Sequence, residues 1–137
     1  MPIANELKVI AGAQELFDWF GYWPTFHDAE IVSLHLNRRS PSSLLVHRGE
    51  PTGKVDERGF YVLGKHVVVE FVFEDIIDLN LGDFSHQNVI SSLHIEKKDE
   101  GFIFTLAQCY GLAGTIDAKK VSIRLNPGRP LDCVEDE

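Results

Sequence analysis

The sequence predicts an α+β fold in which a mainly antiparallel β-sheet packs one face against an N-terminal helix. Apolar residues recur at every second position in several segments, whereas helical spacing is confined to one segment near the start. Short turns separate the segments, which favours antiparallel pairing. The 137 residues contain no repeat or linker, so we expect a single domain over residues 1–137, with a flexible tail from about residue 128.

The expected helix covers residues 13–20 and turns three apolar side chains inward. Gly21 follows at the position where a glycine commonly ends a helix. The next residues, 22–27, predict a loop rich in aromatic side chains, because Pro24 holds the chain extended.

Strands are predicted where the apolar period becomes two. One begins after Asp28 and turns Val32, Leu34 and Leu36 to a single face. The most regular strand covers residues 66–74. The other expected segments are a short strand at 44–47, a polar loop at 49–59, an ambiguous stretch at 76–81, a hairpin joining 90–97 to 102–108, and two charged edge strands at 115–118 and 120–125.

Composition excludes several classes of function. The net charge of −8, from 21 acidic and 13 basic residues, argues against direct nucleic-acid binding, which needs Lys and Arg to replace counterions. No apolar run is long enough to span a membrane and no export signal is visible, so we expect a cytoplasmic protein. The two cysteines, Cys109 and Cys133, are too few for a disulfide framework and are interpreted as reduced thiols.

A polar cluster follows the aromatic loop and contains His27, Asp28 and Glu30. On a regular strand the two carboxylates would point the same way, with Cα atoms about 6.5 to 7 Å apart, and His27 would point oppositely. All three side chains meet at one ion only if the backbone bulges. Two interpretations stay open: the cluster satisfies backbone groups beside Trp23 and Phe26, or it supplies an acid, a base or part of a metal site.

An acidic stretch lies between Lys65 and Lys97, where no Lys or Arg occurs. Such a stretch is typical of a solvated face, and it equally suits a surface that steers a basic protein into contact. The residues that would form this contact surface are Glu70, Glu74, Asp75, Asp78 and Asp83.

Two motifs stand out in the sequence. They are residues 20–31, Phe-Gly-Tyr-Trp-Pro-Thr-Phe-His-Asp-Ala-Glu-Ile, and residues 110–114, Tyr-Gly-Leu-Ala-Gly. Both resemble the bacterial immunity protein 50 family. Thr25 stands where the family pattern has Ser, which preserves the hydroxyl group. The resemblance implies a cytoplasmic protein that binds and neutralises a cognate toxin domain, for example a basic nuclease, without catalysis. It identifies no contact residue.

We therefore expect a non-enzymatic immunity protein with no cofactor, no metal site, no membrane contact and a toxin domain as its partner. Two alternatives remain. The first is a metal-dependent or acid–base enzyme built on His27, Asp28 and Glu30. The second is a regulatory module that binds a small ligand, which would need an enclosed pocket of at least a few hundred Å³. The sequence leaves the oligomeric state open.

Overall fold

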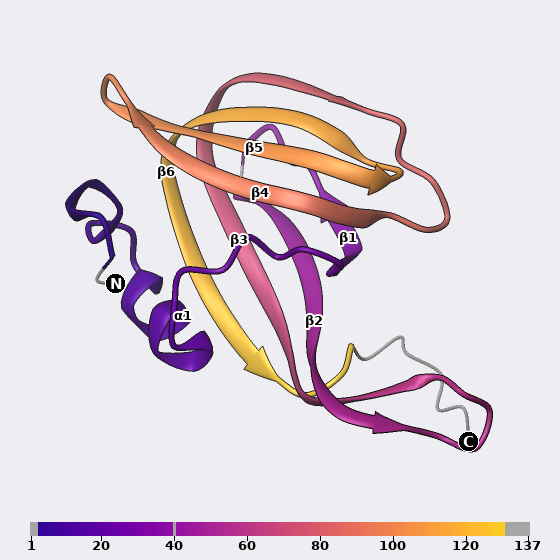
Figure 1. Ribbon diagram of the computed structural model, residues 1–137. Coiled ribbons are helices and arrows are strands. Elements are labelled where there is room, and N and C mark those ends of the chain that lie inside the picture. Colours follow the sequence, from indigo (N-terminus) through magenta and orange to yellow (C-terminus); the bar gives the residue numbers. More distant parts are fainter. Residues whose placement is uncertain (1–2, 40, 131–137) are drawn as a thin grey trace.

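Among the described residues, six strands form one sheet that closes into a barrel (Figure 1). The computed structural model describes residues 3–39 and 41–130. The predicted mainly antiparallel sheet and short helix near the N-terminus are confirmed. None of the described helices is long and apolar enough to cross a membrane. The elements are η1 (Asn5–Leu7), α1 (Ala13–Phe20), β1 (Glu30–His35), β2 (Ser42–Val55), β3 (Tyr61–Gly82), β4 (Val89–Lys98), β5 (Gly101–Tyr110) and β6 (Ala113–Pro127).

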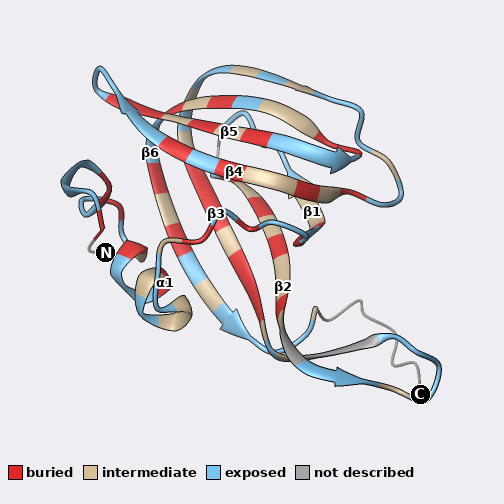
Figure 2. Ribbon diagram, in the orientation of Figure 1, coloured by how far each residue is buried: buried red, intermediate tan, exposed pale blue. Residues whose placement is uncertain are grey.

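The strands follow the order β1-β2-β3-β6-β5-β4 around the barrel, and every ladder between them is antiparallel. Side chains alternate between the two faces of each strand, and most of the buried residues belong to the core on the inner side of the sheet. Figure 2 shows how the buried residues are distributed along the strands. Phe104 on β5 contacts Phe71 and Phe73 on β3 edge-on, with ring centroids 5.2 and 5.1 Å apart. These three rings are almost fully buried and connect β3 to β5 through the core.

The segments predicted as two charged edge strands form one strand, β6. Residues 114–118 of β6 pair with both β3 and β5, so the edge prediction is wrong there. Ile116 and Ala118 point into the core while Asp117 between them lies on the outer side, so strand alternation places the charge outside without requiring an edge.

Beyond Ala118, β6 pairs with β3 alone. The N-terminal segment lies along the other edge of this part of β6. Ile123 N–H donates a hydrogen bond to the Ala11 carbonyl over 2.8 Å. After Ala11 the chain continues through α1 to β4, where Leu93 N–H donates a hydrogen bond to the Thr25 carbonyl over 2.9 Å. Leu16 of α1 lies within the hydrophobic core and is fully buried. The first part of the chain therefore contacts both β6 and β4.

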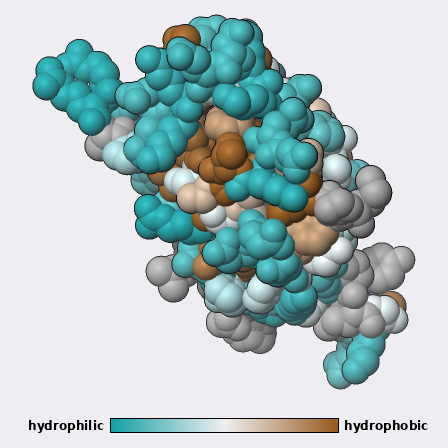
Figure 3. Space-filling view, turned by 90° about the vertical axis from the view of Figure 1, so that its left-hand side faces the viewer, coloured by the Kyte–Doolittle hydropathy of each residue, from teal (hydrophilic) through white to brown (hydrophobic). Residues whose placement is uncertain are grey.

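The surface on this N-terminal side is not uniformly polar. Figure 3 shows this side, with hydrophobic atoms gathered near the middle and hydrophilic side chains around them. A shallow groove of about 430 Å³ is lined by Leu7, Trp23 and Ile95, where the N-terminal segment meets β4. Val9 is 73% exposed. Some apolar side chains of the first residues, such as Leu7, are therefore buried against the barrel, whereas Val9 is left in solvent.

The polar loop predicted at residues 49–59 is wrong, because β2 continues to Val55. The turn is short, and the Asp56 carboxylate closes it by accepting hydrogen bonds from the backbone N–H groups of Arg58 and Phe60, both over 2.9 Å. Pairing with β3 carries this polar sequence into a strand, since backbone hydrogen bonds do not depend on side-chain polarity. The ambiguous stretch at 76–81 is part of β3.

The face predicted for the first strand is also corrected. The register of β1 shifts between Ile31 and Ser33, so one residue is left without a direct partner on β2. Ile31 is buried, Val32 and Leu34 are half-buried, and Leu36 is 51% exposed beyond the end of the strand. The irregularity changes which residues point inward, and a simple alternation of residues cannot reveal it.

We predict that Gly12→Ala strongly destabilises the protein. Gly12 has φ +90°, and an added Cβ would overlap the backbone carbonyl of Ile123 on β6. Gly21→Ala is the matched control, because Gly21 has φ +81° and its added Cβ would meet no atom within 4 Å. The control should lose about 1 to 2 kcal/mol of unfolding free energy, because alanine is strained in the left-handed region. Gly12→Ala should lose clearly more, and urea unfolding measures both losses. Equal losses would contradict this packing of the N-terminal segment on β6.

Candidate functional site

Backbone hydrogen bonds between residues 28–31 and 88–90, here called the closing seam, join β1 to β4. Asp28 N–H donates to the Ile90 carbonyl over 2.8 Å, and Ile90 N–H donates to the Ala29 carbonyl over 2.9 Å. Ile31 N–H donates to the Asn88 carbonyl over 2.9 Å. The first sequence motif therefore closes the barrel through its backbone, which leaves its polar side chains available at the surface.

Asn88 connects the closing seam to the second motif. Its side-chain oxygen accepts hydrogen bonds from Leu112 N–H over 2.9 Å and from Ser85 N–H over 3.0 Å. Its amide nitrogen donates to the Ser85 carbonyl over 2.8 Å. Gly111 has φ +89°, and a Cβ there would overlap the Asn88 side chain. The two motifs thus meet at one nearly buried asparagine.

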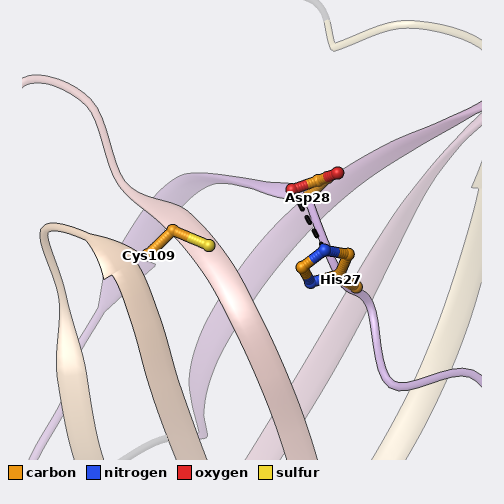
Figure 4. A group of neighbouring side chains, drawn as sticks. All are labelled: His27, Asp28 and Cys109. Atoms are coloured by element: carbon orange, nitrogen blue, oxygen red, sulfur yellow. Dashed lines mark ion pairs between the residues drawn. The ribbon is translucent and has the colours of Figure 1, made fainter.

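His27, Asp28 and Cys109 gather on the outside of the closing seam (Figure 4). His27 Nε2 lies 3.5 Å from Asp28 Oδ1, and one potential ligand atom from each of the three residues lies within 4.8 Å of the others. Asp28 has φ +67° in the turn before β1. The expectation that His27 points away from Asp28 holds for a regular strand, and this turn brings the two side chains together instead.

Glu30 does not join this group. It is exposed and lines a separate surface groove of about 390 Å³ beside Phe84. Asp28 and Glu30 are both exposed where the chain turns into β1. Cys109 joins His27 and Asp28 in place of Glu30, and its distance in sequence gave no local signal for this meeting.

The aromatic residues of the first motif pack into the protein. Phe26 is 2% exposed and contacts Phe20 and Phe71 edge-on, with ring centroids 5.7 and 5.6 Å apart. Trp23 is half-buried against the core. These two side chains support the structural interpretation of the aromatic loop.

The acidic residues predicted as a contact surface lie along β3 and just after it, rather than in one cluster. Glu70 lies 3.8 Å from Arg124 on β6, which offsets its charge within the chain. Asp78 lies directly opposite Asp117 on β6. Like charges side by side on neighbouring strands are unfavourable for stability. Asp83 is exposed in the following loop.

Glu74 and Asp75 line a surface groove of about 620 Å³, to which Arg38 and Arg39 also contribute. The groove lies where β2 stops pairing with β3, after Phe73. Within the described residues, β3 beyond this point pairs with β6 alone. One edge of β3 is therefore free of ladder partners beside two exposed or half-exposed carboxylates.

Residues 12–125 match the family described as Immunity protein 50. The chain belongs to the immunity protein 50 family. The resemblance of the two motifs is thus confirmed over most of the chain. No curated protein and no solved structure matches it. The matched region contains α1, all of β1 to β5, most of β6 and the closing seam.

A second titratable pair in this immunity protein 50 chain lies on the outside of β2 and β3. His47 Nε2 is 3.0 Å from His66 Nδ1, and the rings stack with their centroids 5.1 Å apart. The contact requires one ring to donate and the other to accept, so at least one imidazole is neutral. Burial lowers the pKa of His47 below its usual 6.5, and His66 and Arg129 lower it further. Gly128 N–H donates to the His66 carbonyl over 2.7 Å.

One of the two cysteines, Cys109, lies within the described residues. Cys109 is an exposed free cysteine, and its Sγ lies 3.7 Å from the Ile90 carbonyl oxygen. Cys133 and residues 131–137 of the predicted tail lie outside the described residues.

We predict that the folded state loses stability as the pH falls below about 6.5 because of His47. Its pKa is lower in the folded chain than in the unfolded chain, so the unfolded chain binds the proton more readily. The contribution is complete above the unfolded-state pKa and is lost as the pH drops toward the folded-state value. His47→Gln should flatten this dependence in urea unfolding between about pH 7.5 and 5.5, whereas exposed His94→Gln should keep the wild-type slope. Identical slopes in all three proteins would contradict this role of His47.

We predict that Asn88→Ala lowers the unfolding free energy by about 2 kcal/mol or more, because it leaves two backbone donors without their acceptor. Asn37→Ala provides the control, since the Asn37 side chain is exposed and donates to the Pro41 carbonyl at the surface. The control should lose less than about 1 kcal/mol. Chemical denaturation measures both, and a small effect at Asn88 would show that it does not hold the two motifs together.

Proposed function

We propose that this chain is a non-enzymatic immunity protein that binds and neutralises a cognate toxin domain in the bacterial cytoplasm. The observation that carries the proposal is the family match over residues 12–125. The partner is a basic protein domain, for example a nuclease, whose positive cleft an acidic inhibitor covers.

The charge of the chain supports a basic partner. A net charge of −8 on 137 residues creates a negative field that accelerates encounter with a positive surface. The same field disfavours direct binding to nucleic acid, so an inhibitor of a nuclease would contact the enzyme rather than its substrate.

The free edge of β3 is the contact region that we favour. Asp75 and Asp78 are exposed there, and β3 beyond Phe73 has one edge without a ladder partner among the described residues. An unpaired edge offers backbone donors and acceptors to a strand of another protein. Glu70 contributes less because Arg124 already neutralises it. The contact region therefore centres on residues 74–83.

The two alternative functions have less support from the geometry. A catalytic centre of His27, Asp28 and Glu30 would need the three groups to converge, and Glu30 lines a separate groove. A small-ligand module would need an enclosed pocket. The grooves described here are open to solvent on one side.

The proposal predicts that this protein binds the toxin domain encoded by a neighbouring gene, with an association rate that falls as the salt concentration rises. Asp75→Asn combined with Asp78→Asn should slow association several-fold at low ionic strength and change dissociation little, because exposed charges act mainly on encounter. Asparagine suits the first position, where φ is +57°. Stopped-flow or surface-binding kinetics give both rates, and co-expression with the toxin gives protection.

Glu57→Gln is the matched control, since Glu57 is exposed in the turn between β2 and β3. It should associate almost as fast as the wild type. Equal slowing by both variants would place the contact outside residues 74–83 while leaving the immunity function intact. Absence of binding and protection with every neighbouring toxin domain would overturn the function itself.

A further inference from the structure

We infer that His27, Asp28 and Cys109 form a binding site for a divalent metal ion of the Zn²⁺ type on the outside of the closing seam. The three residues supply an imidazole nitrogen, a carboxylate oxygen and a sulfur atom, each within 4.8 Å of the others. Zn²⁺ accepts this mixed set, whereas Mg²⁺ and Ca²⁺ prefer oxygen ligands alone. The site is independent of the toxin contact proposed above.

All three ligand positions are anchored to the same two residues of β4. Asp28 N–H donates to the Ile90 carbonyl over 2.8 Å, and Cys109 Sγ lies 3.7 Å from that same carbonyl oxygen. His27 Nδ1 lies 3.1 Å from the carbonyl oxygen of Ser91. Segments far apart in the sequence are thereby held together before any ion binds.

The hydrogen bond of His27 selects the nitrogen that would bind the metal. An imidazole that donates from Nδ1 to the Ser91 carbonyl keeps the lone pair of Nε2 free, and Nε2 is the atom that faces Asp28. Histidine ligands of metals commonly donate their other ring N–H to a carbonyl or carboxylate in this way. The arrangement therefore orients His27 as a ligand.

Local irregularities of the backbone aim the other two side chains. Asp28 has φ +67°, which turns its carboxylate toward the neighbouring His27. On β5 the register shifts so that Tyr110 pairs with Val89 and Gln108 pairs with Ile90, which leaves Cys109 without a partner on β4. Bulges of this kind redirect side chains and are frequent beside functional sites. In Figure 4 the Cys109 sulfur points toward the other two side chains.

The distance between the His27 and Asp28 ligand atoms agrees with tetrahedral coordination. Bond lengths of about 2.0 Å to nitrogen or oxygen and about 2.3 Å to sulfur place neighbouring ligand atoms about 3.2 to 3.8 Å apart. His27 Nε2 and Asp28 Oδ1 are 3.5 Å apart. The Cys109 sulfur lies within 4.8 Å of a ligand atom on each of these two residues, and binding of an ion would require it to approach to about 3.5 Å. Three protein ligands leave a fourth position for water, as in open zinc sites.

The test is a metal titration of the full chain in a Cys133→Ser background, so that Cys109 is the only thiol. Zn²⁺ affinity is measured by competition with a chromophoric chelator, and Co²⁺ serves as a spectroscopic probe. We expect one ion per chain and a thiolate-to-cobalt charge-transfer band in the near ultraviolet. His27→Gln, Asp28→Asn and Cys109→Ser should each weaken Zn²⁺ binding by about tenfold or more.

His94→Gln is the control, because His94 is exposed on β4 outside the group. It should bind Zn²⁺ with unchanged affinity, and circular dichroism checks that every variant is folded. Bound Zn²⁺ should also slow alkylation of Cys109 by a thiol reagent. Wild-type affinity in the Cys109→Ser protein, or Co²⁺ binding without the thiolate band, would overturn the inference.

Discussion

The closure of the barrel between β1 and β4 is the constraint on which the other features depend. The ladder there is minimal, with Glu30 opposite Val89, and a few backbone hydrogen bonds from residues 28–31 to residues 88–90 complete it. The buried side chain of Asn88 reinforces this closure, because its oxygen accepts a hydrogen bond from Leu112 N–H. Because backbone groups make these bonds, the exposed side chains of His27 and Asp28 are not needed to close the barrel and remain available for other contacts.

Much of the fold was readable from residue periodicity. The helix at residues 13–20, the regular strand at 66–74 and the hairpin around residue 100 all follow patterns of period 3.6 or two. The closure of the sheet was not predictable, because the order of strands depends on long-range pairing that local patterns do not contain. The polar extension of β2 and the central position of β6 were missed for a related reason, since backbone pairing tolerates charge on an outward face.

The candidate site was predicted in part. His27 and Asp28 stood out as neighbouring ionisable residues, and the turn at Asp28 brings these two together without Glu30. Glu30 was included because it shares the parity of Asp28, and the turn before β1 removes that relation. Cys109 could not be found from the sequence, because only the bulge in β5 and the closing seam bring it near. The family match over residues 12–125 includes both motifs that meet at Asn88.

The contact between Ala11 and β6 has a consequence for the order in which the molecule forms. A ribosome delivers α1 first and its partner strand last, so the apolar side of the helix stays unpartnered while most of the barrel is being made. Contacts between such distant residues carry a large loop-closure entropy and form slowly. A nascent chain that stops before residue 122 therefore lacks the part of β6 that the N-terminal segment contacts.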